Sequence, residues 1–193
     1  MAELLVGYGA MPAHDLLRAV AACFHGIEPD RVVLGHTCAR CGSDEHGRPV
    51  LIASSSVREP AHVSLARSPT LSIAAVTDAG RVGVDLEAEG AADFVGFADV
   101  AMHPDEKRRA DVEPTQLWVR KEALLKASGL GLAIDPREVL ALGPGPLSLP
   151  AVGGAHRRGW LYDLEVPGHR ASVAVIAADP TDLDGLVPTV SRW

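Results

Sequence analysis

Asp85 and Glu87 are two acidic residues that stand two positions apart in a short apolar stretch, residues 82–87. If this stretch is a strand, its two-residue period puts both carboxylates on one face, with their Cα atoms roughly 7 Å apart. Such carboxylates repel each other unless a cation lies between them. Mg²⁺ suits them because it takes one or two carboxylates together with water and phosphate oxygens. The alternative is a strand end with two solvated acids, and the spacing alone leaves both interpretations open.

A second group with chemical potential is Trp118, Glu122 and Lys126, which are spaced four residues apart. On a helix, residues at i, i+4 and i+8 lie close together along the surface. Trp118 is expected to anchor this side of the helix to the core, since a buried Trp contributes a large apolar surface. Glu122 would then face inward to complete a metal site, and Lys126 would meet a phosphate one turn later. The alternative is an ordinary Glu–Lys surface pair, worth roughly a few tenths of a kcal/mol.

Three helices are predicted to carry or support these residues. The first covers residues 12–24, where apolar side chains repeat at helical spacing and a glycine follows the end. A second is expected to begin at residue 103, because a proline and two acidic residues there favour a helix N-terminus. The third covers residues 113–127 and carries Trp118, Glu122 and Lys126.

Strands are predicted on both sides of these helices. Residues 71–77 and 82–87 are expected to pair as a hairpin through the turn residues 78–81. A second predicted pair is formed by residues 160–166 and 171–178, joined at residues 167–170. Two shorter strands are predicted at residues 31–34 and 50–53.

A weak internal similarity relates residues 71–76 to residues 171–176, and each segment is followed closely by an Asp. Short apolar strands resemble each other easily by chance, so a duplicated half and a coincidence both remain open. Residues 90–96 form a link of low helix and strand propensity. This link is the preferred boundary, and it divides the chain into an N-terminal half, residues 1–90, and a C-terminal half, residues 91–193.

The composition of the chain excludes several classes of protein. Its 193 residues are 47% hydrophobic and 22% charged, which is typical of a globular protein with an apolar core. The formal net charge of −7 argues against a nucleic-acid binder that depends on phosphate contacts. No apolar run approaches the ~20 residues that span a membrane, and no secretory signal is evident. The 3 cysteines give no disulfide framework, so a reducing cytoplasm is the expected location.

Taken together, the two acidic groups resemble the signature of the 4′-phosphopantetheinyl transferases. The signature combines Gly83-Val84-Asp85-Leu86-Glu87 with Trp118-x-x-Lys121-Glu122-Ala123-x-x-Lys126, about thirty residues further on. Upstream, Cys38-x-x-Cys41-Gly42 and His46-Gly47-Arg48-Pro49 look like the segment that precedes the coenzyme A pocket in actinobacterial members. The resemblance covers most of the chain. It is strongest to the longer class with pseudo-two-fold symmetry, which modifies polyketide and nonribosomal peptide synthetase carriers.

The resemblance implies an α+β fold of two similar halves, with the active site in the cleft between them. It implies a holo-[acyl-carrier-protein] synthase activity (EC 2.7.8.7) in which a carrier serine attacks the β-phosphate of coenzyme A. Asp85, Glu87 and Glu122 would hold Mg²⁺, Glu122 or a metal-bound water would take the serine proton, and Lys126 would neutralise the leaving phosphate. Asp85, Glu122 and Lys126 are therefore the expected catalytic residues, and adenosine 3′,5′-bisphosphate is the expected second product.

The chain departs from the family at its coenzyme A-binding positions. Members usually carry Ser-His-Ser before the first long strand, and here the matching positions read Ala66-Arg67-Ser68. Arg67 could replace the histidine as a phosphate binder but not as a titrating group, because guanidinium is always charged. Arg67 and Ser68, together with Arg18 and Arg48, are the expected coenzyme A contacts beside Lys126. For Arg18, a solvated helix face is an equal alternative.

These departures leave a second function open, a module that binds coenzyme A or a carrier protein without turnover. The expected partners are coenzyme A and an acyl or peptidyl carrier domain, with no nucleic acid and no membrane. Because carriers are usually acidic, an apolar patch near Phe94 and Phe97 is the predicted docking surface. The two-half architecture implies a monomer.

Cys38 and Cys41 have the spacing of metal ligands. A structural zinc needs four ligands, and His36 and His46 could complete the set. The alternative is a loop turn without a metal. A zinc-bearing interaction domain is thus a third hypothesis, and metal analysis of the purified protein would test it.

Overall fold

The computed structural model describes residues 2–38, 41–52, 61–109, 111–149, 157–177 and 180–193, and it shows a mixed α+β fold. The first of two four-stranded sheets has the order β10-β1-β5-β4, formed by Pro188–Arg192, Leu4–Gly9, Ser72–Thr77 and His62–Arg67. The second has the order β6-β9-β8-β7, formed by Arg81–Ala88, His169–Ala177, Arg157–Val166 and Gly145–Leu149. A separate antiparallel pair joins β2 (Leu34–Thr37) and β3 (Arg48–Leu51).

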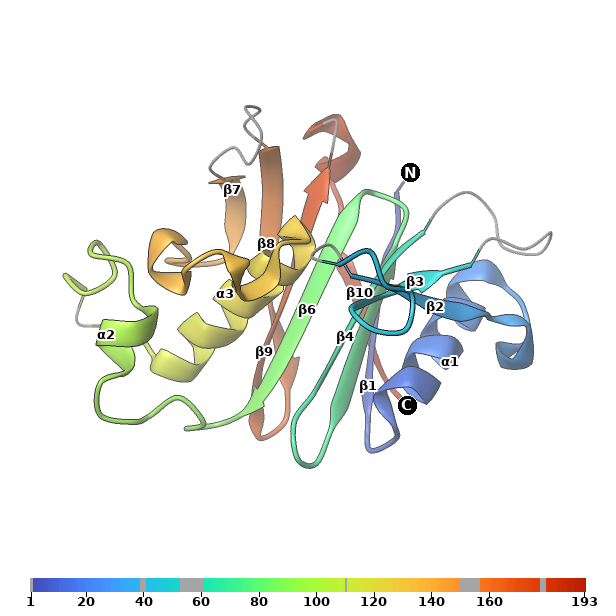
Figure 1. The fold of residues 1–193 in the computed structure, drawn as a ribbon, viewed down its shortest axis with the longest axis horizontal. Helices are drawn as coiled ribbons and strands as arrows, with labels where there is room; N and C mark the ends of the chain where they lie inside the picture. The colour runs from blue at the N-terminus through green and yellow to red at the C-terminus, as the bar shows by residue number, and fades with distance from the viewer. Residues whose placement is uncertain (1, 39–40, 53–60, 110, 150–156, 178–179) are drawn as a thin grey trace.

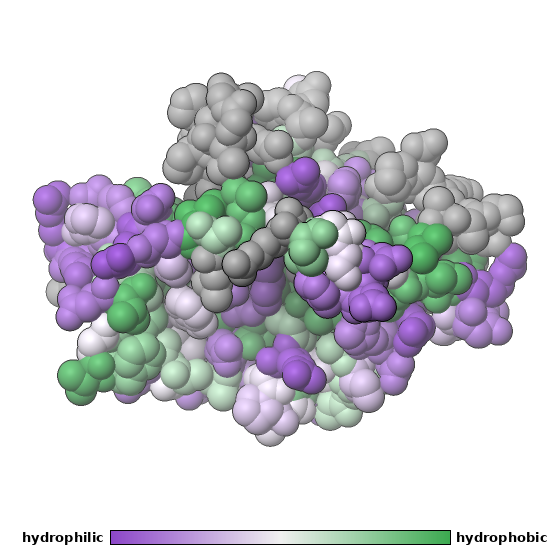
Figure 2. All heavy atoms as spheres, viewed as in Figure 1, coloured by the Kyte–Doolittle hydropathy of each residue, from purple (hydrophilic) through white to green (hydrophobic). Residues whose placement is uncertain are grey.

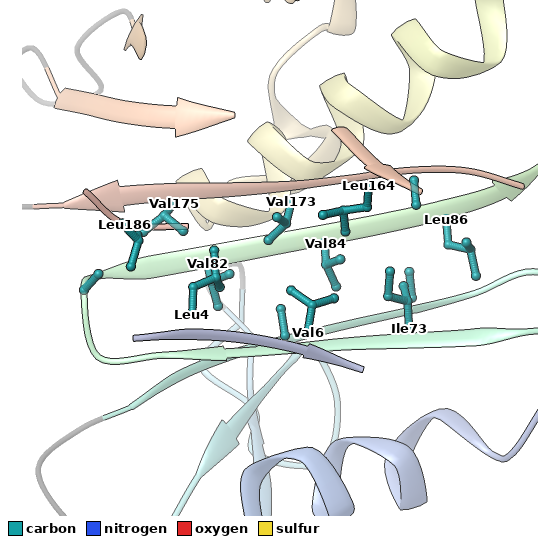
Figure 3. Packing of buried hydrophobic residues seen from close by; sticks show 14 of the residues in the cluster. Leu4, Val6, Ile73, Val82, Val84, Leu86, Leu164, Val173, Val175 and Leu186 are labelled. Atoms are coloured by element: carbon teal, nitrogen blue, oxygen red, sulfur yellow. The ribbon is translucent and has the colours of Figure 1, made fainter. Parts of the chain in front are cut away.

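The two sheets face each other, and each is covered on its outer side by a helix (Figure 1). Helix α1 (Ala13–His25) packs on the first sheet, and helix α3 (Pro114–Ser128) packs on the second. The main core lies between the sheets, where Val6 and Ile73 of the first sheet meet Val84, Leu86 and other residues of the second (Figure 3). A hydrogen bond also joins the sheets, because the backbone N–H of Val84 donates to Ser64 Oγ at 3.1 Å. The layers therefore follow the order α1, first sheet, second sheet, α3.

The two long helices agree with the sequence prediction. Helix α1 ends at Gly26, whose positive φ of 65° suits a glycine cap, and it buries the stripe formed by Leu16, Leu17, Val20 and Ala21. Helix α3 begins behind Glu113, whose carboxylate accepts the backbone N–H groups of Thr115 and Gln116, and it ends at Gly129. Short elements complete the helical part: α2 (Phe97–Ala101) and the 3₁₀ turns Pro29–Arg31, Gly131–Ala133, Pro136–Glu138 and Pro180–Leu183.

Strand β6 shows the predicted alternation. Val82, Val84 and Leu86 belong to the core between the sheets. On the other face, Gly83 lies directly beneath α3: a Cβ atom added there would be 2.0 Å from the carbonyl oxygen of Ala123 and 2.4 Å from the backbone nitrogen of Ala127. Only glycine allows this approach, which brings the helix against the strand that carries Asp85 and Glu87.

The predicted hairpin of residues 71–77 and 82–87 is wrong. Strand β5 pairs with β1 and β4, whereas β6 pairs with β9 along the whole stretch from Arg81 to Ala88. Both strands are largely buried, so each needs neighbouring strands and other elements packed on its faces. An isolated hairpin would not provide enough of these contacts. At the connection, Gly80 has a φ of 146°, and its missing Cβ leaves room for the carbonyl of Ile176.

The helix predicted at residue 103 is also wrong. The chain forms a turn there, in which the N–H groups of Glu106 and Lys107 donate to the carbonyl of His103, and the nearby helix is α2 instead. The Glu106 carboxylate accepts the N–H of His103 and also the N–H of the distant Ala141. The hydrogen bond to Ala141 holds this segment in a turn, because the Glu106 carboxylate binds two distant parts of the chain at once.

Other predicted strands are found with changed bounds. The pair β8 and β9 matches the prediction, with a turn at Pro167 and Gly168. The short strand predicted at residues 31–34 is a 3₁₀ turn followed by β2, which begins at Leu34. The one predicted at residues 50–53 is β3, which begins earlier, and residue 53 lies outside the described part of the chain.

Sheet membership does not follow chain order at two points. Strand β6 precedes residue 91 but belongs to the second sheet, and the C-terminal strand β10 returns to pair in parallel with β1 of the first sheet. The boundary at residues 90 and 91 stays a prediction. In the part of the chain that the structure describes, no helix has both the length and the apolar character that crossing a membrane requires.

Candidate functional site

Lys126 and Asp85 form the centre of the site, where α3 crosses β6. Nζ of Lys126 lies 2.7 Å from Oδ1 of Asp85 and donates a second hydrogen bond to the carbonyl of Val84 at 3.1 Å. The Asp85 residue is 5% exposed, whereas the Lys126 side chain is 31% exposed. The ammonium group of Lys126 therefore lies between the buried carboxylate of Asp85 and the solvent.

One oxygen of Asp85 is left without a partner. Oδ2 is buried and accepts no hydrogen bond from any described residue. A buried carboxylate oxygen without a donor costs about 1–3 kcal/mol, since it loses its water without replacement. Such an atom is available to a cation or to a donor that a ligand brings.

Glu87 and Glu122 belong to the same electrostatic cluster. Burial, and then the negative charge of Asp85, raise the pKa of Glu122 above its usual value, and Glu87 adds a further rise that Lys126 opposes. Burial and Asp85 likewise raise the pKa of Glu87, against the effect of Lys126 and His169. Three carboxylates thus share one nearby lysine, and the excess negative charge favours cation binding or protonation.

The three carboxylates are electrostatically coupled but do not form one compact group of ligand atoms. Among the described residues, the one group whose metal-ligating atoms all lie within 4.8 Å of one another is Cys38, Cys41 and His46. Asp85, Glu87 and Glu122 are therefore spread more widely than three direct ligands of one ion. A metal held by all three requires side-chain rotation or bridging water.

A cavity of about 660 Å³ adjoins Lys126, and its lining is basic. We call it the basic cavity. Among the described residues, its charged lining residues are Arg48, Arg81 and Lys126 and none is acidic, although the chain has a net charge of −7. The walls come from the β2–β3 hairpin, β4, the beginning of β6, and the residues that follow α3, with Gly129 and Gly131 among them.

The field in this region is positive. Burial lowers the pKa of His62, and the positive charges of Arg48 and Arg81 lower it further. Arg81 is itself held in place, because its Nη1 donates to the carbonyl of Ser128 at 3.0 Å. A cavity with these side chains suits an anionic ligand such as a phosphate ester.

The other predicted coenzyme A contacts lie elsewhere. Arg67 and Ser68 line a second cavity of about 640 Å³, the α1 cavity, which begins at the N-terminal end of α1 and shares Leu65 with the basic cavity. Arg18 lines neither of these cavities, and its guanidinium is paired with Asp15 at 3.1 Å on the exposed side of α1. Among Arg18, Arg48, Arg67 and Ser68, the residue that lines the same cavity as Lys126 is Arg48.

His169 is a site residue that the sequence prediction missed. It is the first residue of β9, directly after the Pro167-Gly168 turn, and its Nε2 lies 3.0 Å from Ser68 Oγ and 3.2 Å from Thr70 Oγ1 in the connection between β4 and β5. Its Nδ1 lies 3.1 Å from the carbonyl of Pro167, which can only accept, so this nitrogen carries a proton. A histidine in a Pro-Gly turn shows no period or motif, so no signal in the sequence pointed to it.

A buried ion pair between Lys121 and Glu106 anchors helix α3. Nζ of Lys121 lies 2.7 Å from Oε2 of Glu106, and both side chains are 0% exposed. Lys121 also donates to the carbonyls of Pro136 and Val139, at 2.9 Å and 2.6 Å. Burial lowers the pKa of Lys121, although Glu106 acts against that shift. This lysine is next to Glu122 in the chain but is enclosed in the protein.

The N-terminal part of α3 is tied to the second sheet. Arg120 Nε donates to Asp163 Oδ1 of β8 at 2.9 Å, and Gln116 Nε2 donates to the same oxygen and to Ser172 Oγ of β9, each at 2.9 Å. Trp118 packs against the core beneath α3, with its ring centroid 6.5 Å from that of Phe97. These contacts fix the helix that presents Glu122 and Lys126.

The comparison with protein families agrees with this geometry. Residues 81–173 match the model of the 4′-phosphopantetheinyl transferase superfamily. The match begins at the first residue of β6 and ends within β9, and it includes Asp85, Glu122 and Lys126. A search of curated proteins finds no significant match to the chain.

Proposed function

We propose that this protein transfers the 4′-phosphopantetheine group of coenzyme A to a serine hydroxyl of an acyl or peptidyl carrier protein. The observation that carries the proposal is the position of Lys126, which lines the basic cavity and pairs with Asp85. A cavity suited to phosphates and a carboxylate cluster suited to a cation therefore meet at one side chain. The superfamily domain at residues 81–173 supports the same reaction.

Mg²⁺ fits the carboxylate cluster. The unpartnered Oδ2 of Asp85 favours a cation, and so does the negative charge of Asp85 that, after burial, raises the pKa values of Glu87 and Glu122. Asp85, Glu87 and Glu122 would hold the ion, and their spread suits Mg²⁺, which commonly keeps several waters. When bound, the ion would neutralise charge on the pyrophosphate and polarise a phosphoryl oxygen.

The cationic residues of the chain would orient coenzyme A. Arg48 would engage a phosphate at the nucleotide end, because guanidinium binds phosphate through paired donors. Lys126 lines the same cavity and would neutralise charge on the leaving phosphate. Holding the phosphates between these groups aligns the reacting centre with the incoming hydroxyl.

Glu122 is the proposed base. Its carboxylate belongs to the same electrostatic cluster as Asp85 and Lys126, and its place on α3 is one turn before Lys126. The proton of the serine hydroxyl would pass to this carboxylate as the new O–P bond forms at the β-phosphate. The bond from that phosphorus to the bridging oxygen would break, releasing adenosine 3′,5′-bisphosphate and the holo-carrier.

We also propose that the two α+β halves are related by pseudo-two-fold symmetry, as in the longer class of these transferases. The strand order β1-β5-β4 corresponds to β6-β9-β8, and each set has one long helix on its outer face. A glycine also lies beneath each helix: Gly7 approaches Val20 of α1 as Gly83 approaches α3. This architecture supports an active monomer, since both walls of the basic cavity come from one chain.

The carrier would dock near α2. Phe94, Val95 and Val100 are exposed there at 55%, 105% and 58%, and Figure 2 shows apolar residues at this end of the molecule. Phe97 is 5% exposed and packs edge-to-face with Phe94, so it supports the surface from below and is not a contact itself. An apolar contact suits two partners that are both acidic.

The activity is tested by incubating the protein with coenzyme A, Mg²⁺ and an apo-carrier, and by measuring the intact mass of the carrier. A gain of one phosphopantetheine, abolished by chelation of Mg²⁺ and by Asp85→Asn or Glu122→Gln, is the expected result. Comparing the modification of polyketide and nonribosomal peptide synthetase carriers with that of a fatty-acid carrier would identify the class of substrate.

The rival function is a binding module without turnover, which the Ala66-Arg67 departure motivates. Calorimetric titration with coenzyme A separates the two hypotheses. Binding of coenzyme A with no modification of any carrier supports the module. Absence of both binding and modification contradicts both.

A further inference from the structure

The loop between β2 and β3 gathers three side chains that the transferase chemistry does not use. These are Cys38, directly after β2, Cys41, within the loop, and His46, shortly before β3. Their sulfur and nitrogen atoms all lie within 4.8 Å of one another, and Sγ of Cys41 is 3.4 Å from Nε2 of His46. We infer that these residues form a binding site for a thiophilic divalent cation, with Zn²⁺ as the first candidate.

The grouping of the three ligand atoms is compatible with tetrahedral zinc coordination. With Zn–S bonds of about 2.3 Å and Zn–N bonds of about 2.05 Å, two ligand atoms of a tetrahedral site are roughly 3.6–3.8 Å apart. The Cys41–His46 separation of 3.4 Å is close to such an edge, so an ion fits after small side-chain rotations. Two thiolates and an imidazole select Zn²⁺ over Mg²⁺, because Mg²⁺ prefers oxygen ligands.

The backbone of the loop is shaped for this grouping. The N–H of Cys38 donates to the carbonyl of Ser43 at 2.9 Å, and the N–H of Gly42 donates to the carbonyl of Cys38 at 2.8 Å. Gly42 has a φ of 73°, which closes the Cys-x-x-Cys turn. At Gly47 a Cβ atom would be 2.4 Å from the carbonyl of Thr37, so the two ends of the loop touch through a glycine.

Apolar packing does not account for this compact turn. None of the described loop residues, Cys38 and residues 41–47, is buried. A loop that orders without burying side chains needs another source of stability, since each ordered residue costs about 1–2 kcal/mol of conformational entropy. Metal coordination supplies it by linking the two ends of the loop to its middle.

The ion would have three protein ligands, and water would take the fourth position, because Cys41 and His46 are exposed. His36 does not belong to the group, and its Nε2 lies 3.3 Å from Nε2 of His14. The site is separate from the carboxylate cluster. It has a structural consequence for the basic cavity, because Cys38, Gly47 and Arg48 all line that cavity.

Metal analysis of the untagged protein, purified without chelators and under reducing conditions, tests the site. About one zinc per chain is expected in the wild type. Cys41→Ser is expected to lower zinc binding at least ~10-fold. Cys23→Ser is the matched control, because Cys23 is exposed on α1 and belongs to no ligand group, and it is expected to keep the full zinc content. Asp85→Asn is expected to keep it as well, which separates this ion from Mg²⁺.

A second measurement keeps the inference testable if Cys41→Ser does not fold. Cobalt added to the metal-free wild type is expected to give a thiolate-to-cobalt charge-transfer band and the visible bands of a tetrahedral ion. Hydrogen exchange in residues 34–51 is expected to slow when zinc is restored, and exchange in α1 is expected to stay unchanged. Absence of both zinc and the cobalt bands, or equal zinc content in Cys41→Ser and the wild type, would overturn the inference. None of these results depends on transferase activity.

Discussion

Nζ of Lys126 lies 2.7 Å from Oδ1 of Asp85, while Oδ2 of the same carboxylate is buried and accepts no hydrogen bond from the residues that the structure describes. Asp85 therefore has one oxygen neutralised by the chain and one oxygen left for a cation. The same lysine lines the basic cavity, so a ligand phosphate bound there would approach the amine that now pairs with Asp85. Under the proposed function, this relationship would connect ligand binding, metal binding and stability.

Lys126→Met is expected to abolish transfer and to destabilise the metal-free protein by about 1–3 kcal/mol, because it leaves the charge of Asp85 buried without a partner. Mg²⁺ is expected to restore part of this loss, since the cation would then neutralise the same carboxylate. Urea unfolding with and without Mg²⁺ measures both effects. Lys107→Met is the control: Lys107 forms an exposed pair with Asp99 at 3.0 Å, and its loss is expected to change stability by at most about 0.5 kcal/mol. Equal losses in the two variants would contradict the prediction.

Gly83→Ala is expected to displace α3 from β6. The new Cβ would stand 2.0 Å from the carbonyl of Ala123, and backbone cannot yield as a flexible side chain does. We expect a destabilisation of about 1–3 kcal/mol and a larger fractional loss of activity, because Glu122 and Lys126 move with the helix. Thermal unfolding and carrier modification provide the two measurements. Gly143→Ala, where the added Cβ meets no atom within 4 Å, is expected to change neither.

Glu122→Gln is expected to stabilise the metal-free protein at neutral pH while abolishing transfer. Folding raises the pKa of Glu122, so the folded state favours the protonated form. The favourable contribution of Glu122 to folding stability is complete below its pKa in the unfolded chain. It is lost as the pH rises through its pKa in the folded protein. The melting temperature of Glu122→Gln should therefore exceed that of the wild type. The difference should grow as the pH rises from the unfolded-state pKa of Glu122 to its folded-state pKa. Added Mg²⁺ should reduce or reverse the margin, and a pH-independent difference between the two proteins would refute this account.

Arg48→Ala is expected to weaken coenzyme A binding by about 10-fold or more, since it removes a charge-assisted phosphate contact from the basic cavity. Arg18→Ala is expected to leave the affinity within about two-fold, because Arg18 is paired with Asp15 and lines neither cavity. Calorimetric titration of both variants with coenzyme A makes the comparison. A larger effect at Arg18 than at Arg48 would show that the nucleotide end binds near α1.

Lys121→Met is expected to destabilise the protein by about 3–5 kcal/mol, because it leaves the buried Glu106 carboxylate without its cation. The matched control is Arg108→Met, which removes an exposed pair with Asp105 and should change stability by at most about 0.5 kcal/mol. Coenzyme A affinity should stay unchanged in whatever fraction of Lys121→Met folds, since the lysine is enclosed. A selective loss of affinity without loss of stability would assign Lys121 to the site instead.

The sequence predicted the parts of the site that depend on local order. Helix α3 was recognised because its cap residues and its end at Gly129 are local signals. The prediction that Asp85 and Glu87 lie on the same face of their strand followed from the two-residue period of a strand. This period holds whatever the strand pairs with. Lys126 was selected by its spacing from Glu122. These features need only bond geometry and nearest-neighbour interactions.

The partners of each strand could not be read in the same way. Strands 71–77 and 82–87 looked like a hairpin because a turn separates them, yet they lie in different sheets. Strand pairing depends on which buried faces meet, and distant residues such as Val6 and Val173 decide that. The helix expected at residue 103 failed for a similar reason, since Glu106 is held by Lys121 and Ala141.

By itself, the sequence determined which residues could do chemistry and which face or helix carries them. Only the tertiary structure decided which of them meet: Arg48 joins Lys126 in the basic cavity, Arg67 and Arg18 do not, and His169 reaches Ser68 from the other sheet. The physical reason is that periods and caps are set within a few residues of chain. Cavities and charge clusters are set by contacts between segments far apart, whose free energy depends on the packing of the whole core.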